Sequence, residues 1–206
     1  MLNLIIKDLL FNKKQCIYGL LGGMLVSLMI IDDVSFSLAG IILVPGILFS
    51  FIVGRMCYLE DNISVKSLLQ SLPIKKSDIV ISKYLEGYLT FIISYIILIL
   101  ANFIIGFFYE NRYDLTSYFI IIGFSIVNIY NSLYLYLNFR YNYETAQKAV
   151  YVLLGIFFLA AFGYKYMAMF GIDNMSMMGI SICVIMISVL TSILFCYLSI
   201  KNYNKD

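Results

Sequence analysis

Long apolar runs, separated by short polar stretches, dominate the chain. A membrane-spanning helix needs about 20 mostly apolar residues, and six runs reach or approach that length. They cover residues 16–31, 36–58, 84–109, 115–139, 149–166 and 176–200. Such runs could also be buried strands of a soluble protein, but six of them at helix-spanning length favour membrane helices. The pattern therefore predicts an all-α integral membrane protein with six transmembrane helices.

The positions of the Lys and Arg residues orient these six segments. If both termini are cytoplasmic, only Arg112 and Lys165 of the 14 basic residues fall on the outer side. Membrane proteins concentrate Lys and Arg in their cytoplasmic loops. We therefore expect both termini to be cytoplasmic and the outer loops to be very short. The one sizeable polar segment, residues 59–83, then faces the cytoplasm.

Composition supports a lipid environment and excludes several kinds of chemistry. Hydrophobic residues make up 62% of the 206 residues and charged residues 13%, whereas soluble domains have about 25% charged residues. Because the chain has no His, imidazole zinc sites, haem ligation and Ser-His-Asp triads are excluded. The net charge of +2 does not indicate a nucleic-acid partner. The four cysteines form no Cys-x-x-Cys pair, and we expect small buried apolar residues rather than a metal site.

The first 14 residues have an amphipathic pattern. Their apolar positions share one face of a helical wheel: Leu2, Ile5, Ile6, Leu9 and Leu10. Such a helix can lie along the inner membrane surface before the first span begins. We therefore expect an amphipathic elbow helix at residues 1–14.

The cytoplasmic segment contains a second short helical pattern. Its apolar side chains follow the i, i+3, i+4, i+7 spacing of one helix face: Val65, Leu68, Leu69 and Leu72. Pro73 ends this helix. A helix of this length is not stable alone in water, so its apolar stripe rests either on the membrane surface or in a groove of another protein. The pattern alone does not decide between the two.

Small residues within the first two spans indicate close helix packing. Gly19 and Gly23 have the small-xxx-small spacing, and so do Gly46, Ser50 and Gly54. This spacing lets helix backbones approach closely. The stripes are typical of a seam within the chain or between two chains, although membrane helices also tolerate Gly without such a role.

The most polar residues within the spans are Asn102, Asn128 and Asn131. We interpret them as interhelical hydrogen-bond partners, with the lining of a translocation path as the alternative. No charge lies deep inside a predicted span, whereas ion-coupled transporters and proton pumps usually keep one there. The pattern thus argues against secondary active transport, and equally against an integral-membrane protease or phosphatase.

The segment between the second and third spans also carries a soft motif. Its parts are the pair Glu60-Asp61, the triplet Ser71-Leu72-Pro73, the pair Lys75-Lys76 and the stretch Ile79-Val80-Ile81-Ser82-Lys83-Tyr84-Leu85. The segment resembles the corresponding part of small type-2 ABC transporter permeases, the ABC-2 family membrane subunits of bacterial peptide and antimicrobial exporters. The resemblance extends to the layout of the whole chain. It implies a single transmembrane domain over residues 1–206, with two spans in 16–58 and four further spans and a tail in 84–206.

This resemblance implies a division of labour between subunits. A separate cytoplasmic ATPase would bind ATP and Mg, because the chain lacks a Gly-x-x-x-x-Gly-Lys-[Ser/Thr] phosphate loop. The apolar stripe of residues 65–72 would be a coupling helix in a groove of that ATPase. Charged residues around it would set its orientation: Glu60, Asp61, Lys66, Lys75 and Lys76. A second permease chain, identical or different, would complete the complex.

The expected function is therefore that of a permease subunit in the bacterial plasma membrane. It would export amphipathic peptides, antimicrobials or lipid-like molecules, and we do not expect the chain itself to be an enzyme or to hold a cofactor. The alternative is the substrate-binding membrane subunit of a vitamin uptake (energy-coupling factor) system. That class needs a polar pocket near the outer face, and the short outer loops count against it.

Overall fold

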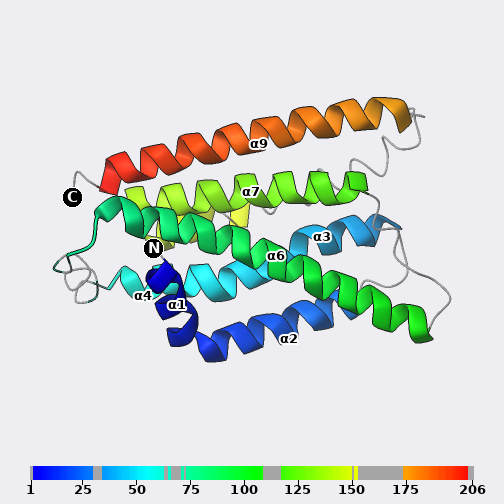
Figure 1. Cartoon of the computed structure of the whole chain (residues 1–206), viewed down its shortest axis with the longest axis horizontal. Coiled ribbons are helices and arrows are strands. Elements are labelled where there is room, and N and C mark those ends of the chain that lie inside the picture. The colour runs from blue at the N-terminus through cyan, green and yellow to red at the C-terminus, as the bar shows by residue number, and fades with distance from the viewer. Residues whose placement is uncertain are drawn as a thin grey trace.

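The computed structural model describes residues 2–29, 34–62, 65, 71, 73–108, 117–149, 151–152 and 174–203, and all regular elements in these ranges are helical. The helices are α1 (Leu2–Phe11), α2 (Lys13–Met29), α3 (Val34–Phe49), α4 (Arg55–Glu60), α6 (Lys76–Phe108), α7 (Ser117–Arg140) and α9 (Asn174–Tyr203). A π-helical turn, η1 (Ser50–Gly54), joins α3 to α4. The long helices run along the molecule, and α1 lies across them near the left-hand end in Figure 1. The expected all-helical fold is confirmed for this part of the chain.

Within the described ranges, four helical segments are long and apolar enough to cross a membrane: Ile41–Glu60, Lys76–Ala101, Ile120–Arg140 and Ile182–Tyr203. They coincide with the second, third, fourth and sixth predicted spans. Helix α2 covers most of the first predicted span, and its 17 residues extend about 25 Å at the usual helical rise. The fifth predicted span, residues 149–166, lies almost entirely outside the described residues.

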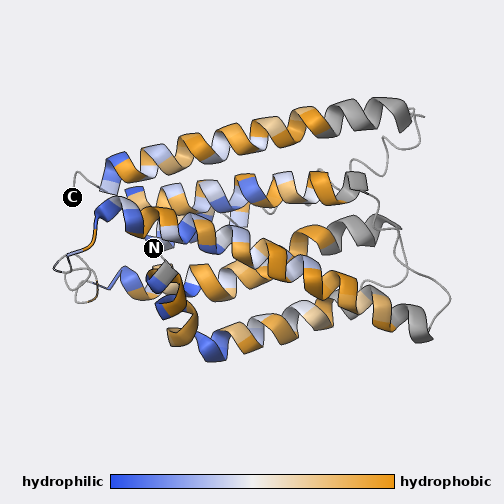
Figure 2. Ribbon diagram, in the orientation of Figure 1, coloured by the Kyte–Doolittle hydropathy of each residue, from blue (hydrophilic) through white to orange (hydrophobic). Residues whose placement is uncertain are grey.

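Hydrophilic residues gather at one end of the bundle, on the left in Figure 2. Basic residues mark the helix ends there: Lys13 begins α2, Lys76 begins α6, and Arg140 and Lys201 lie in the last turns of α7 and α9. The N-terminal helix and the C-terminus lie toward the same end (Figure 1). We call this end of the molecule the polar end. Its concentration of Lys and Arg is typical of a cytoplasmic face.

The packed core lies where α3, η1, α6 and α7 meet. Phe49 at the end of α3 is buried, and its ring meets those of Tyr130 and Tyr134 edge-on, with centroids 6.1 and 5.4 Å apart. Helix α9 packs on α7 and α6 and exposes an apolar outer face. An exposed apolar face on a helix of this length is typical of contact with lipid rather than water.

Two glycines allow α2 to lie directly on the second span. A Cβ atom at Gly19 would come within 3.2 Å of Cβ of Phe51, and one at Gly23 within 3.3 Å of Cγ1 of Val44. The first small-residue stripe therefore lies at a seam within the chain.

The second small-residue stripe, Gly46, Ser50 and Gly54, does not pack along one neighbouring helix of the described part. A Cβ atom at Gly54 would lie 3.6 Å from the Tyr134 hydroxyl, whereas one at Gly46 would have no described atom within 4 Å. Ser50 is exposed and donates its hydroxyl hydrogen to the carbonyl of Gly46, 2.8 Å away. Only Gly54, at the end of the π-helical turn, therefore lies against another helix within the described part of the chain.

Gly123 and Gly46 offer a matched test of this packing. A Cβ atom at Gly123 would overlap Cγ2 of the buried Ile41, a branched side chain with little freedom to move, whereas Gly46 has open space. We expect Gly123→Ala to lower the free energy of unfolding by about 1–3 kcal/mol. Gly46→Ala should leave it unchanged or raise it slightly, because Ala favours a helix. Thermal unfolding of the purified protein in detergent measures both, and equal midpoints would contradict the packing of α3 against α7.

Candidate functional site

Two polar side chains, one near the end of α1 and one just after it, face the protein. Asp8 and Asn12 are buried at 2% and 4% exposure, whereas Ile6, Leu10 and Phe11 are more than half exposed. Asp8 and Asn12 point inward because both find partners on other helices.

Asn12 connects the corner between α1 and α2 to the second span. Its side-chain nitrogen donates a hydrogen bond to the carbonyl of Ile52, 3.2 Å away, within the π-helical turn. A π-helical turn departs from the regular α-helical ladder and is frequent at functional sites. The contact therefore fixes α1 to the point where the second span is irregular.

Asp8 forms a buried ion pair with Lys83 of α6. The Lys83 ammonium lies 2.7 Å from Oδ2 of Asp8, and the two side chains are 1% and 2% exposed. The same ammonium lies 3.1 Å from Oε1 of Glu60, at the end of α4, and 3.8 Å from Oε2 of Glu86, one turn further along α6. Lys83 thus stands among three carboxyl groups from three helices.

A second cation completes the cluster. Lys7 is half-exposed, and its ammonium lies 2.9 Å from Oδ1 of Asp8 and 3.8 Å from Oε1 of Glu60. We call the five residues Lys7, Asp8, Glu60, Lys83 and Glu86 the polar junction. It joins α1, α4 and α6, so it holds together both helices that flank the segment between residues 61 and 75.

The charge of Asp8 is maintained by its neighbours. Burial opposes ionisation, but attraction to Lys83, the hydrogen bond from Lys83 and the nearby Lys7 and Glu86 side chains outweigh it, and the pKa of Asp8 lies below its ordinary value of 3.8. A carboxyl with a depressed pKa contributes stability above its ordinary pKa and loses it as the pH falls through the lowered value. The pair of Asp8 with Lys83 is therefore fully formed at neutral pH.

Sequence reasoning missed most of the polar junction. It assigned Glu60 to a rim around the coupling helix, named Lys83 only as part of the motif between the second and third spans, and did not single out Asp8 or Glu86. The structure turns Glu60 inward toward Lys83, with 15% of its side chain exposed. The available signal was the spacing of Lys83 and Glu86, because residues three apart share a helix face.

The other expected docking residues lie on or beside the polar end. Asp61 is exposed and accepts a hydrogen bond from the backbone N–H of Tyr143, 3.2 Å away. Lys75 and Val65 are exposed, and the Lys76 ammonium lies 5.9 Å from the centre of the Tyr203 ring. Lys66, Leu68, Leu69 and Leu72 lie outside the described residues, so the coupling helix itself stays a prediction.

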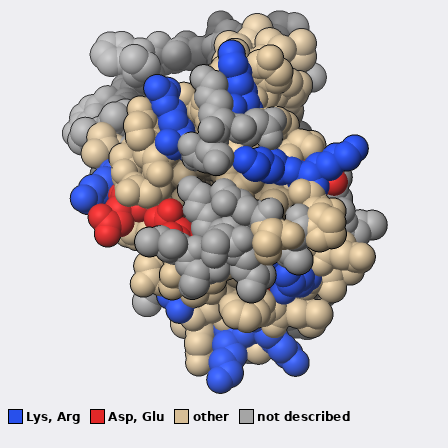
Figure 3. All heavy atoms as spheres, turned by 90° about the vertical axis from the view of Figure 1, so that its left-hand side faces the viewer, with Lys and Arg blue, Asp and Glu red and all other residues tan. Residues whose placement is uncertain are grey.

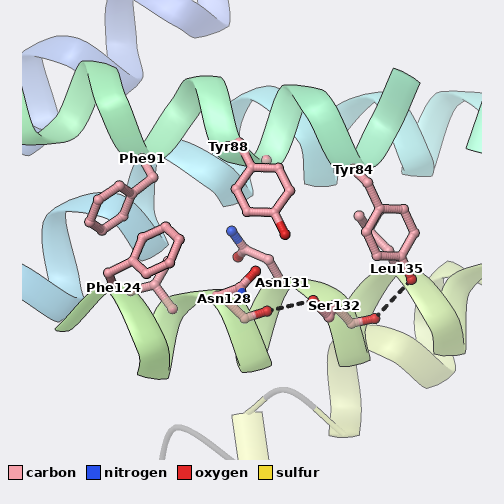
Figure 4. A pocket seen from close by; sticks show the side chains of 10 residues that line it. Tyr84, Tyr88, Phe91, Phe124, Asn128, Asn131, Ser132 and Leu135 are labelled. Atoms are coloured by element: carbon pink, nitrogen blue, oxygen red, sulfur yellow. Dashed lines mark hydrogen bonds between the residues drawn. The ribbon is translucent and has the colours of Figure 1, made fainter. Parts of the chain in front are cut away.

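A narrow crevice lies between α6 and α7, deeper in the bundle (Figure 4). Its walls are largely aromatic, with Tyr84, Tyr88 and Phe91 from α6 and Phe124 from α7. None of the residues that line it in the described part of the chain is charged. As the helices stand, the crevice has room for no more than about one water molecule, so it would admit an apolar or amphipathic molecule only if α6 and α7 moved apart.

Hydroxyl groups and one asparagine join this crevice to α9. Tyr84 and Tyr88 form hydrogen bonds with the hydroxyls of Ser199 and Ser192, at 3.1 and 2.7 Å. The side-chain nitrogen of Asn128 donates to the carbonyl of Ser188, 3.0 Å away. Asn128 is thus an interhelical hydrogen-bond partner, as its position within an apolar span indicated.

Asn131 differs from Asn128. It is 7% exposed, lines the crevice, and its carbonyl oxygen Oδ1 has no hydrogen-bond partner among the described residues. Figure 4 shows its side chain between the helices, pointing toward α6. An unsatisfied buried acceptor is costly, and this one can accept a hydrogen bond from a molecule that enters the crevice. Asn102 lies in α6, but its side chain is outside the described part.

A family model for ABC-2 family transporter proteins matches residues 3–204. The chain belongs to the ABC-2 transporter family. No curated protein and no solved structure matches it. The family match and the apolar helices make the chain a multi-pass membrane protein, the permease component of an ABC transporter. Membership implies a partner ATPase and a lipid bilayer, and it favours the permease over the vitamin-uptake subunit.

The polar junction of this ABC-2 permease yields a direct test. Replacing one member of a buried ion pair leaves the other charge without compensation and costs about 3–5 kcal/mol. We expect Lys83→Met to lower the free energy of unfolding by that amount, measured by thermal or denaturant unfolding in detergent. Lys75→Met, at an exposed position, should change it by less than about 0.5 kcal/mol.

A double variant separates the ion pair from simple loss of packing. Asp8→Asn combined with Lys83→Met removes both charges, so its cost should be smaller than the sum of the two single variants. Additive losses would show that Asp8 and Lys83 contribute independently, and would contradict the junction.

Proposed function

We propose that this ABC-2 permease is the membrane subunit of an ATP-driven exporter in the bacterial plasma membrane, with amphipathic peptides, antimicrobials or lipid-like molecules as cargo. The observation that carries the proposal is the polar junction. It joins α4 and α6, the two helices that bracket residues 61–75, to α1 by contacts of 2.7 and 3.1 Å around Lys83. A movement imposed on that segment would therefore reach three helices at once.

The proposed topology has six spans, with the polar end facing the cytoplasm. Four spans and α2 support it, as does the grouping of basic helix ends at one side. Helix α1 would be the elbow at the inner membrane surface, with Ile6, Leu10 and Phe11 toward lipid. Its polar residues would then be satisfied by the protein rather than by water.

The proposed mechanism begins at the coupling helix of residues 65–72. The partner ATPase binds ATP and Mg and grips the apolar stripe in a groove. When the ATPase subunits close, α4 and α6 shift together because the polar junction links them. Helix α6 also forms one wall of the crevice, so its displacement changes the space between α6 and α7.

The nature of the cargo rests on the crevice. Its aromatic rings offer apolar contact, while the free acceptor of Asn131 offers one hydrogen bond to a donor such as an amide N–H. An amphipathic peptide or lipid-like molecule presents both features. A second permease chain would complete the path.

The coupling helix is tested by a charge placed in its apolar stripe. We expect Leu68→Asp and Leu72→Asp each to abolish binding of the partner ATPase, because a carboxylate cannot enter an apolar groove without losing its hydration. Co-purification from membranes measures the loss. Leu68→Met, which keeps an apolar side chain of similar volume, should retain the complex.

The membrane part should remain folded in both Asp variants, with an unchanged elution profile in detergent. Full ATPase binding by both of them would refute the proposed docking mode and, with it, the mechanism.

The crevice is tested at Asn131. Asn131→Leu should cost little stability, because the carbonyl oxygen that it removes has no partner. It should reduce cargo-stimulated ATP hydrolysis several-fold in the reconstituted complex, with the basal rate unchanged. Thr191→Val is the control, since its hydroxyl bonds only within α9 to the Ser188 carbonyl. Equal stimulation in both variants would remove Asn131 from the path.

A further inference from the structure

Glu86 is the least compensated member of the polar junction. Its side chain is 1% exposed, and neither of its carboxyl oxygens has a hydrogen-bond partner among the described residues. The Lys83 ammonium lies 3.8 Å from Oε2, which is too far for a hydrogen bond. Figure 3, which looks onto the polar end, shows other charged side chains at the surface, where water can solvate them. Glu86 has neither this solvation nor a close cation.

The two cations of the junction are already balanced by its other two carboxylates. Asp8 lies 2.7 Å from the Lys83 ammonium and 2.9 Å from that of Lys7. Glu60 lies 3.1 and 3.8 Å from the same two groups. Two ammonium groups and two carboxylates leave no net charge, so an ionised Glu86 would add a buried negative charge without compensation. A group in that position becomes neutral instead.

No other group supplies the missing positive charge within the described part of the chain. The residues described there include no cluster of acidic or thiol side chains that could hold a metal ion. Cys57 and Cys16 also lie near the junction, but a thiol is largely uncharged at neutral pH. The charged and titratable groups around Glu86 are therefore Lys83 on its own helix, Lys7 and Asp8 on α1, Glu60 and Cys57 on α4, and Cys16 on α2.

Asp8 responds to Glu86 as it would to a neutral group. The Glu86 side chain helps to lower the pKa of Asp8, whereas a carboxylate in that place would raise this pKa by repulsion. A neutral carboxyl group lowers it by offering its hydrogen to the Asp8 carboxylate. The behaviour of Asp8 therefore agrees with the charge balance.

We propose that Glu86 is a proton-binding site that is occupied at neutral pH, and that the partners of Lys83 control its occupancy. While Asp8 and Glu60 compensate Lys83, the proton stays on a carboxyl oxygen of Glu86. If Glu60 loses its charge, Lys83 lacks its second carboxylate. Glu86 then releases its proton to water and takes that place, and only its O–H bond breaks.

The site makes the junction sensitive to pH. Loss of the proton at alkaline pH, with Glu60 still charged, leaves one surplus negative charge among α1, α4 and α6, and so weakens the contact between these helices. The proton site does not depend on transport or on an ATPase, because it concerns only the charges of the folded permease.

Infrared spectroscopy of the full permease in lipid nanodiscs detects the proton directly. A neutral carboxyl group has a C=O stretching band that a carboxylate lacks. We expect this band at pH 7 in the unmodified permease and its loss in Glu86→Gln. Asp61→Asn, which removes the exposed acid next to Glu60, should keep the band. A spectrum that Glu86→Gln leaves unchanged in this region would refute the proton site.

Glu60→Gln tests the control by Lys83, because it removes the second carboxylate and keeps its size. The band should disappear as it does in Glu86→Gln, since Glu86 then ionises beside Lys83, while the matched variant Asp61→Asn keeps it. A band that persists in Glu60→Gln would contradict the charge balance and, with it, the proposed site.

The pH dependence of stability gives a second readout, by denaturant unfolding in detergent. The unfolded chain ionises Glu86 near the ordinary pKa of about 4.3, whereas the folded permease keeps it neutral, so folding takes up one proton. The folding equilibrium constant should therefore fall up to about tenfold for each pH unit above pH 5. Glu86→Gln should abolish this slope, because an amide needs no proton to be neutral.

Asp8→Asn is the matched control, since it makes the same change from carboxyl to amide at a carboxylate that is paired. At pH 7 it should lower the unfolding midpoint, whereas Glu86→Gln should leave the midpoint unchanged or raise it. Equal losses in the two variants would show that Glu86 is ionised in the folded permease and would overturn the proposal.

Discussion

The charge of Lys83 governs the arrangement of the helices at the polar end. An ammonium group that is 1% exposed has lost its water, and only close carboxylates can compensate for that loss. They come from α1 and α4, and the Glu86 carboxyl group of its own helix lies 3.8 Å away. Lys83 is therefore compatible with few positions of these helices, because a shift of any one would leave a buried charge without its partner.

This constraint explains how a ten-residue helix keeps a defined place. Helix α1 is too short to be stable by itself in water, and three of its apolar side chains are more than half exposed. Two buried polar contacts hold it, from Asp8 to α6 and from Asn12 to the π-helical turn. The helix is thereby fixed to both sides of the coupling segment rather than floating at the membrane surface.

Helix α6 connects the ion pairs of Lys83 to the interior of the helix bundle. Its 33 residues extend about 50 Å at the usual helical rise, more than the roughly 30 Å of a bilayer core. The same helix holds Lys83 at the polar end and, further along, the aromatic wall of the crevice. Hydrogen bonds between membrane helices contribute only about 0.6 kcal/mol each. The contacts of Tyr84, Tyr88 and Asn128 with α9 can therefore rearrange at small cost, while the ion pairs of the junction cannot.

The sequence by itself determined the class of protein and the position of most spans. Runs of apolar residues near 20 in length have one stable form in lipid, and the distribution of Lys and Arg identifies the cytoplasmic side. Each run of apolar residues and each basic loop can be recognised by itself, so these predictions do not require knowledge of how the helices pack. Residue type and spacing also indicated a seam at Gly19 and Gly23 and a bonding role for Asn128, but left an alternative open for each, and the structure decided both.

Only the tertiary structure decided which polar residues meet. Asp8 and Lys83 are 75 residues apart, and no pattern along the chain indicates that α1 folds back against α6. The sequence treated Glu60 as a surface charge, because residue type does not show whether a carboxylate faces water or a buried ammonium. Burial and pairing depend on how helices cross, which is set by the packing of all of them together, and this is why the junction could not be predicted from the sequence.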